Sequence, residues 1–174
     1  MSLTAAERDL LAGARRATLA TVAQDGRPRL VPICFVEIDG VMWSPIDEKP
    51  KSTSDPRRLA RVRDIEARSD VTVLVDRWSE DWAELAWLRI DGRAELVGSE
   101  HAVVVALRAK YPQYADHDLE HRPLIRIDIA HATSWFASAA DTDAAGRTVD
   151  DLHPATLDAN PDDGISRPRG SGSE

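Results

Sequence analysis

The sequence has few of the residues on which several protein classes depend. Its 174 residues include one cysteine, Cys34, which excludes an intramolecular disulfide framework and a metal site built from several cysteines. No run of 18 apolar residues is present, so the sequence predicts no membrane-spanning helix. Residues 1–11 are charged and lack the apolar core of a secretory signal. We therefore expect a cytoplasmic protein that does not bind membranes.

Positive charge is also scarce. Thirty acidic residues face 22 basic ones, for a net charge of −8, which argues against a general nucleic-acid binder. Apolar residues make up 43% of the chain, enough for a core, and we expect one domain over residues 1–140. Residues 141–174 contain eight acidic and three basic residues and few large apolar ones. They predict a flexible acidic tail, because little apolar surface is present to offset the entropy of ordering.

One basic segment interrupts this acidic chain. Residues 49–64 carry a charge of about +4, follow a predicted strand over residues 41–46, and lead into a predicted helix at Asp55-Pro56. A strand end, a polar loop and a helix start together can bind an anion. Charge alone favours a solvent-exposed basic helix face, and the anion site needs the further support described below.

The first half of the chain predicts a helix followed by an antiparallel meander. Residues 4–16 show helical periodicity, and Thr4 and Glu7 have the spacing of a capping box. Strand-like runs follow at residues 18–22, 30–36 and 41–46, separated by Asp-Gly pairs that are typical of hairpins. Cys34 would lie inside the second strand as a small core residue.

The second half predicts further strands and one helix. The apolar run 71–75 indicates a central strand covered on both faces, and the tryptophan-containing residues 77–84 indicate a loop. Asp91-Gly92 separates two strand-like runs that form either a hairpin or one bent strand. Ser99 is expected to cap a helix that ends near Lys110, and residues 123–129 and 134–137 form the last strand. The whole predicts a mainly β fold, a small antiparallel barrel with helices.

Catalytic motifs are weak. The segment 117–121, His-Asp-Leu-Glu-His, matches an inverted zinc-protease pattern, but it follows Tyr111-Pro112 in a polar stretch without an apolar face. We interpret it as a solvated connector and expect no metal. The sequence has no glycine-rich dinucleotide fingerprint, phosphate-binding P-loop or nucleophile elbow. If the protein is an enzyme, its chemistry therefore belongs to a cofactor.

A family resemblance is carried by the order of several short motifs. These are Thr18-Leu19-Ala20-Thr21-Val22, Asp25-Gly26-Arg27-Pro28, Trp43-Ser44-Pro45-Ile46, Lys49-Pro50-Lys51-Ser52, Val71-Thr72-Val73-Leu74-Val75 and Trp87-Leu88-Arg89-Ile90-Asp91-Gly92. Over residues 4–137 the chain resembles the split-barrel superfamily of pyridoxamine-phosphate oxidases. Within it, the chain looks most like the oxidoreductases that use the deazaflavin coenzyme F420.

The resemblance implies a six-stranded antiparallel split β-barrel and a homodimer with two cofactor sites at the subunit interface. It also implies hydride transfer between reduced F420 and a small organic substrate. Two alternatives remain: an FMN-dependent enzyme of the same fold, and a non-catalytic binder of flavin, deazaflavin or haem.

The resemblance also implies cofactor-binding residues. Lys49, Lys51 and Ser52 would bind the cofactor phosphate, with Lys51 the most important. Ser44, Pro45 and Ile46 would line the ring, together with Leu19, Thr21, Pro32 and Cys34 from neighbouring strands, and Trp82 and Trp87 would reach the partner's site.

The residues that follow the Lys49–Ser52 segment add further expectations. Arg57, Arg58 and Arg61 would meet the polyglutamate tail of F420. Asp64 departs from the asparagine that relatives often carry a little after the basic element. Lys110 is expected to be a surface residue without a role in the site.

Overall fold

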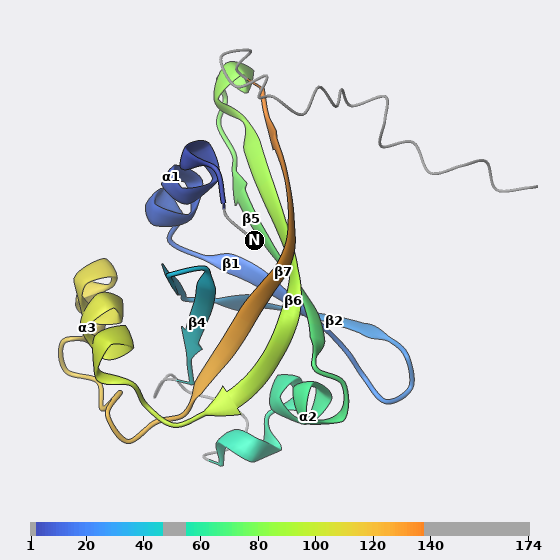
Figure 1. Ribbon diagram of the computed structural model, residues 1–174, viewed down its shortest axis with the longest axis vertical. Helices are drawn as coiled ribbons and strands as arrows, with labels where there is room; N and C mark the ends of the chain where they lie inside the picture. Colours follow the sequence, from blue (N-terminus) through green and yellow to red (C-terminus); the bar gives the residue numbers. More distant parts are fainter. Residues whose placement is uncertain (1–2, 47–54, 138–174) are drawn as a thin grey trace, which may run out of the picture. The chain divides into compact units, whose positions relative to one another are not determined.

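Residues 3–46 and 55–137 are described by the structure, a computed structural model, and they lie within one compact unit, Met1–Asp141. Seven strands in this part of the chain form one sheet in the order β2-β1-β5-β6-β7-β4-β3, with every neighbouring pair antiparallel (Figure 1). The strands are β1 Ala17–Val22, β2 Pro28–Ile33, β3 Val36–Ile38, β4 Val41–Pro45, β5 Asp70–Arg77, β6 Ala86–Val97 and β7 Leu124–Phe136. The α-helices are α1 Ala5–Gly13, α2 Ala60–Ala67 and α3 His101–Lys110, and the short 3₁₀ helices are η1 Pro56–Arg58, η2 Trp82–Glu84 and η3 Pro112–Tyr114.

The mainly β, antiparallel prediction is confirmed, with seven strands where the resemblance implied six. The predicted strand over residues 30–36 is interrupted, so that β2 ends at Ile33 and β3 begins at Val36. Cys34 lies in this break and not inside a strand. The Tyr111 hydroxyl accepts a hydrogen bond from the Phe35 N–H and donates one to the Phe35 carbonyl, both at 2.9 Å. These bonds satisfy backbone groups that a continuous strand would pair within the sheet.

Strand β6 settles the alternative between a hairpin and one bent strand in favour of the bent strand. Its pairing with β7 shifts register between Asp91 and Gly92. A Cβ atom at Gly92 would lie 2.5 Å from the carbonyl oxygen of Asp128, so the glycine permits β7 to approach at this bulge. The two pieces predicted for the last strand likewise form one strand, β7.

Strand β5 is central in the sheet but is covered on one face. Val71, Val73 and Val75 are buried, whereas Leu74 is 40% exposed. The prediction of two covered faces was wrong, because no helix of the described residues packs over the outward side of this strand. A run of valine and leucine does not by itself distinguish a covered outer face from an exposed one.

The first residues of α1 and α3 test the two predicted helix caps. The Thr4 hydroxyl accepts the Glu7 N–H and the Glu7 carboxylate accepts the Thr4 N–H, which confirms the capping box. Glu7 also accepts a hydrogen bond from Ser134 at 2.9 Å, which links α1 to β7. Helix α3 starts after Glu100 without a side-chain cap, so the predicted Ser99 cap was wrong.

The predicted helix at Asp55-Pro56 divides into two elements. Asp55 caps η1 by accepting the Arg57 N–H at 3.0 Å, and α2 starts separately after Leu59. Within the described residues, every helix is too short or too polar to cross a membrane. The predicted tail over residues 141–174 lies outside the described residues.

Candidate functional site

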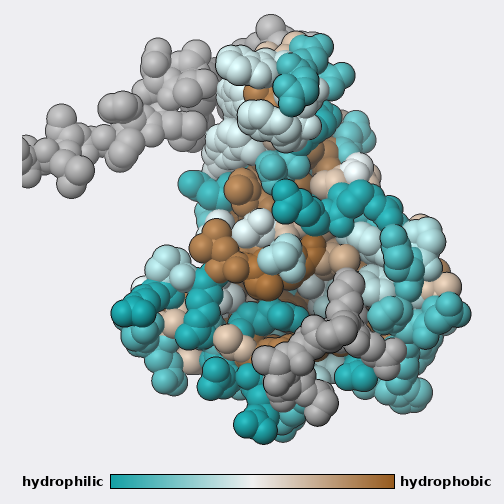
Figure 2. Space-filling model, turned by 180° about the vertical axis from the view of Figure 1, so that it is seen from behind, coloured by the Kyte–Doolittle hydropathy of each residue, from teal (hydrophilic) through white to brown (hydrophobic). Residues whose placement is uncertain are grey.

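The two faces of the neighbouring strands β2, β1, β5 and β6 have different surroundings. On the inner face, Leu19, Val73 and Leu88 are fully buried in the main core. On the outer face, Leu30 is 67% exposed and Leu74 is 40% exposed. Figure 2 shows apolar side chains gathered in the middle of the side opposite to the view of Figure 1 and bordered by hydrophilic ones. A cluster of exposed apolar groups in one place is typical of a binding surface.

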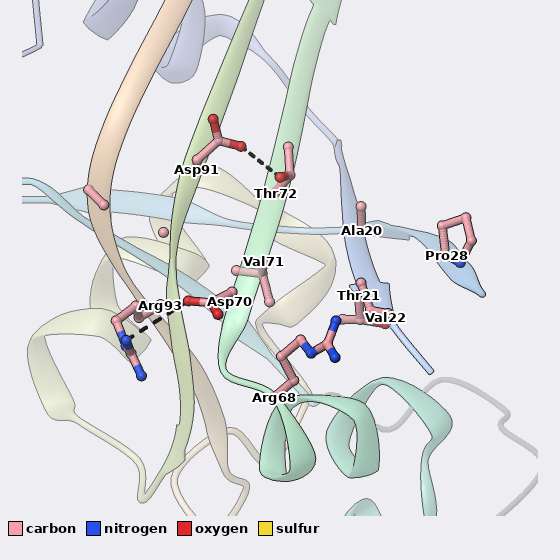
Figure 3. Close-up of a pocket in the computed structure, with 12 residues that line it drawn as sticks. Ala20, Thr21, Val22, Pro28, Arg68, Asp70, Val71, Thr72, Asp91 and Arg93 are labelled. Carbon is pink, nitrogen blue, oxygen red and sulfur yellow. Dashed lines mark hydrogen bonds and ion pairs between the residues drawn. The ribbon is translucent and has the colours of Figure 1, made fainter. Parts of the chain in front are cut away.

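A groove of about 630 Å³ lies on this outer face (Figure 3). It is formed mainly by β1, β5 and β6, with one residue each from β2 and β7 and with Arg68 at the end of α2. Its apolar lining consists of Ala20, Val22, Pro28, Val71 and Ala130. Apolar walls with a few polar groups are the usual composition of a small-molecule site.

The polar groups of the groove are partly paired. The Thr72 hydroxyl donates to Asp91 at 2.7 Å, and Arg93 lies 3.9 Å from Asp70 (Figure 3). Arg68 forms no ion pair or side-chain hydrogen bond with the described residues, and in Figure 3 its side chain extends toward Thr21. The groove therefore offers an apolar wall with an available guanidinium group beside it. This combination suits a flat apolar ring that carries an anionic group.

Helix α2 is held against the sheet by a buried carboxylate. Asp64 is 3% exposed and accepts hydrogen bonds from the Thr21 hydroxyl at 2.9 Å and from Arg29 at 3.0 and 3.1 Å. These bonds join α2 to β1 and β2. Asp64, at the position where the resemblance led us to expect asparagine, therefore has a structural role. The pairing with Arg29 compensates the carboxylate charge that burial would otherwise penalise.

The elements η1 and α2 present a basic surface. We call Arg57, Arg58, Arg63 and Arg68 the arginine surface, since all four are exposed. Arg57 and Arg58 belong to η1, Arg63 to α2, and Arg68 ends α2 at the groove. Helix α2 thus connects the groove with the cluster of positive charge. An extended anion with a flat head group would match this arrangement.

Most of the sequence-predicted site residues are buried or far apart in one chain. Ser44, Pro45 and Ile46 are buried where β4 pairs with β7, and Leu19 points into the core, so these side chains do not reach the outer face. Thr21 is buried but borders the groove.

The exposed candidates lie in different places. Pro32 is exposed opposite Thr18, and half-buried Trp87 is paired with Trp135. Trp82 is 72% exposed in η2, at the end of the β5–β6 hairpin. Arg57 is exposed at the other end of the sheet, in η1 (Figure 1). Cys34 is half-buried between β2 and β3. Lys49, Lys51 and Ser52 lie outside the described residues.

The groove residues Ala20, Thr72, Asp91 and Arg68 were not expected as site residues. The alternation of inward and outward side chains along β1 and β5 is the signal that would have found the first two. The sequence does not predict that Arg68 lies at the groove, because its position depends on how α2 packs on the sheet.

Lys110 lies away from the groove, between α3, α1 and the β2–β3 break. Its ammonium nitrogen is 3.9 Å from the centre of the Phe35 ring and donates to the Leu11 carbonyl at 2.8 Å. Burial, and then the positive charge of Arg15, lower the pKa of Lys110 to about 8. Lys110 therefore links α3 to α1 and to the β2–β3 break. It is half-buried and not the surface residue that was expected, and the absence of a role in the site stays a prediction.

The segment 117–121 stabilises the turn after α3. Arg108 pairs with Glu120 at 2.5 and 3.0 Å, and His121 lies 2.8 Å from Asp118. Leu119 is fully buried. The segment forms no helix that would align its two histidines. Within residues 3–46 and 55–137, no cluster of three or more His, Cys, Asp or Glu side chains is arranged to hold a metal ion.

Comparison with known proteins identifies the family. A family model described as pyridoxamine 5'-phosphate oxidase matches residues 3–136. The chain belongs to this family. The match spans every described strand, from β1 to the last residue of β7. Comparison with curated proteins finds no match.

Several solved structures share the fold of this family member. A conserved hypothetical protein from Mycobacterium tuberculosis is 22% identical, with a TM-score of 0.62 over 79% of this chain and 87% of the other. An F420 reductase is 20% identical, with a TM-score of 0.55 over 72% and 94%. The haem storage protein HutZ from Vibrio cholerae is 16% identical, with a TM-score of 0.56 over 78% and 95%. At these identities the likeness shows the fold alone.

Proposed function

We propose that this chain is an F420-dependent oxidoreductase that transfers a hydride between the reduced deazaflavin and a small organic substrate. The observation that carries the proposal is the arginine surface, which leads along α2 to an apolar groove. A deazaflavin with a polyglutamate tail combines a flat ring with an extended chain of carboxylates. The presence of an F420 reductase among the proteins of the same fold supports this choice.

The residues of the chain would bind and orient the cofactor. Arg57 and Arg58 would pair with tail carboxylates, since guanidinium groups bind carboxylates with two parallel hydrogen bonds. Ala20 and Val22 would contact the ring from the groove wall. Lys49, Lys51 and Ser52, outside the described residues, would bind the phosphate as the family resemblance implies. When bound, the deazaflavin supplies hydride transfer, and the protein contributes by holding the substrate against it.

The proposed active form is a homodimer. The groove opens on the outer face that leaves Leu30 and Leu74 exposed. A second copy packed on this face would remove these side chains from water and close the groove. Pro32 and Trp87 lie on the same face, so that they would approach the site once two copies meet.

The experiment is a binding titration of the purified protein with F420, FMN and haem, followed by turnover with reduced F420. We expect tighter binding of F420 than of FMN. Arg57→Ala should weaken F420 binding by about tenfold, because one charge-assisted hydrogen bond contributes roughly 1.5–3 kcal/mol and an exposed one lies at the low end. Its effect on FMN should be small, since FMN lacks the tail.

The matched control is Arg16→Ala, because Arg16 is exposed and precedes β1, away from η1 and α2. This variant should bind F420 as the parent does. FMN affinity equal to or above that of F420 would favour the FMN-dependent alternative. A Soret band that develops on haem addition, without turnover of reduced F420, would favour a non-catalytic haem binder.

A further inference from the structure

Two cations, Lys110 and Arg15, lie close together where the end of α3 meets the segment after α1. The Lys110 ammonium donates to the Leu11 carbonyl at 2.8 Å and lies 3.9 Å from the centre of the Phe35 ring. The Arg15 guanidinium donates to the Lys110 carbonyl, and its central carbon lies 4.9 Å from the centre of the Tyr111 ring. Within the described part of the chain, neither cation is paired with a carboxylate. The pair therefore has room for a negative charge that these residues do not supply.

Two further titratable groups face the Lys110 amine. The Tyr111 ring lies 5.8 Å from it, and the Cys34 thiol of the β2–β3 break is near enough to influence its charge. The Tyr111 hydroxyl is already bonded to the Phe35 backbone through both its proton and its oxygen, at 2.9 Å each. We call Lys110, Arg15, Cys34, Phe35 and Tyr111 the Lys110 cluster. Arg15 is its one strong anion-binding group apart from Lys110 itself.

The cluster makes the amine of Lys110 more reactive than that of an ordinary lysine. Burial, and then the charge of Arg15, lower the pKa of Lys110 to about 8. At pH 8 about half of the Lys110 side chains therefore carry an uncharged amine, against about one in 250 for an ordinary lysine. The uncharged amine has a lone pair and is a nucleophile, whereas the ammonium ion is not.

The surroundings of this amine favour a small, neutral electrophile. Lys110 is half-buried, and the fully buried ring of Phe35 lies against its nitrogen, which leaves little room for a bulky reagent. Carbon dioxide is small and uncharged, and its product with an amine is a carbamate anion. A carbamate carries two oxygens, and a guanidinium such as that of Arg15 binds such groups with two parallel hydrogen bonds. The N–H that remains on the nitrogen can still donate to the Leu11 carbonyl.

We propose that Lys110 is a site of reversible carbamylation by carbon dioxide and that Arg15 binds the resulting carbamate. The amine nitrogen forms a bond to the carbon of carbon dioxide while one C=O electron pair moves to oxygen. The nitrogen then releases one proton to the solvent, so the side chain changes from a neutral amine to an anion without any oxidant or reductant. The inference is independent of the proposed cofactor, because no residue of the Lys110 cluster lines the groove.

The test measures carbamate at each lysine of the full-length protein. The protein is incubated with ¹³C-labelled bicarbonate at pH 8, and carbamates are fixed as ethyl esters with triethyloxonium before peptide mass spectrometry. The chain has two other lysines, Lys49 and Lys51, which report the background in the same sample. Occupancy at Lys110 should exceed that at either of them by at least about tenfold, because far more of its amine is uncharged. In ¹³C NMR of the unfixed sample, a carbamate resonance should be present in the parent and absent in Lys110→Arg.

Matched variants test the role of Arg15. Arg15→Glu should lower occupancy at Lys110 at least about tenfold, because a carboxylate keeps the amine protonated and repels the carbamate. Arg15→Gln removes the charge but keeps a donor for the Lys110 carbonyl, and it should lower occupancy about threefold or more. The control is Arg16→Glu, which makes the same change in charge at an exposed neighbour outside the cluster. It should stay within about twofold of the parent.

Three outcomes would overturn the assignment. These are an occupancy at Lys110 no higher than at the other two lysines, an equal loss in Arg15→Glu and Arg16→Glu, and a carbamate resonance that persists unchanged in Lys110→Arg. Circular dichroism of each variant verifies that it is folded. If Arg15→Glu does not fold, the comparison of Arg15→Gln with the control decides the role of Arg15.

Discussion

The two faces of the central strands show how one sheet serves two purposes. Leu88 on β6 is fully buried, whereas Leu74 on the neighbouring β5 is 40% exposed. The inner face stabilises the fold by removing apolar surface from water. The outer face leaves apolar groups, the groove and, at its end, Arg68 accessible. The difference shows that side chains of the same type contribute to stability on one face and are available for binding on the other.

The largest expected effect is on the inner face. Leu88→Ala should lower the free energy of unfolding by about 3 kcal/mol, because it removes buried apolar surface and leaves a cavity. Leu74→Ala should change the unfolding of the monomer by less than about 0.5 kcal/mol and should weaken self-association instead. Urea denaturation and sedimentation of both variants measure the two effects. Similar losses of stability in both would mean that the two faces are not distinct.

The next effect concerns the buried carboxylate that positions the arginine surface. Asp64→Ala should lower the free energy of unfolding by about 2 kcal/mol, since Thr21 loses its partner and half-exposed Arg29 is released. Asp64→Asn keeps an acceptor for Thr21 and should lose only about 1 kcal/mol. Urea denaturation distinguishes the two. If the asparagine variant were the less stable one, the charge and not the hydrogen bonds would hold α2.

A smaller effect is expected in the salt dependence of cofactor binding. Because Arg57 and Arg58 are exposed, their attraction for an anionic tail weakens as ionic strength rises. F420 affinity should fall between 50 and 300 mM salt, and the fall should be shallower in Arg57→Ala with Arg58→Ala. Titrations at several salt concentrations measure the slopes. Parallel slopes for parent and variant would show that these arginines do not contact the cofactor.

The smallest effect compares Asp64, whose charge is paired with Arg29, with Lys110, whose contacts among the described residues include no carboxylate. Lys110 has a pKa of about 8 in the folded chain and an ordinary value near 10.5 when unfolded. Between these values the unfolded chain binds more protons at this site, so its contribution to stability rises with pH over this window. Lys110→Met should remove that rise. Unfolding measured from pH 7 to 10.5 tests this, and identical pH profiles for parent and variant would contradict it.

Local patterns predicted much of this fold. Thr4 and Glu7 indicated the start of α1, and Asp-Gly pairs indicated the turns of an antiparallel meander, because capping and turn geometry depend on a few neighbouring residues. The break at Cys34 could not be predicted in this way. It depends on the hydroxyl group of Tyr111, which lies 76 residues after Phe35 along the chain. The same reason explains why Lys110 was misjudged, since its contacts come from α1 and the β2–β3 break.

The sequence by itself determined the mainly β antiparallel class, the basic segment after residue 48 and the family resemblance, since all three depend on composition and the order of short motifs. Only the tertiary structure decided which valines and leucines face the core, that Asp64 joins Thr21 and Arg29, and that Arg68 lies at the groove. Strand periodicity shows that two faces differ but not which one is covered. That depends on how the sheet curls and on which helices pack against it.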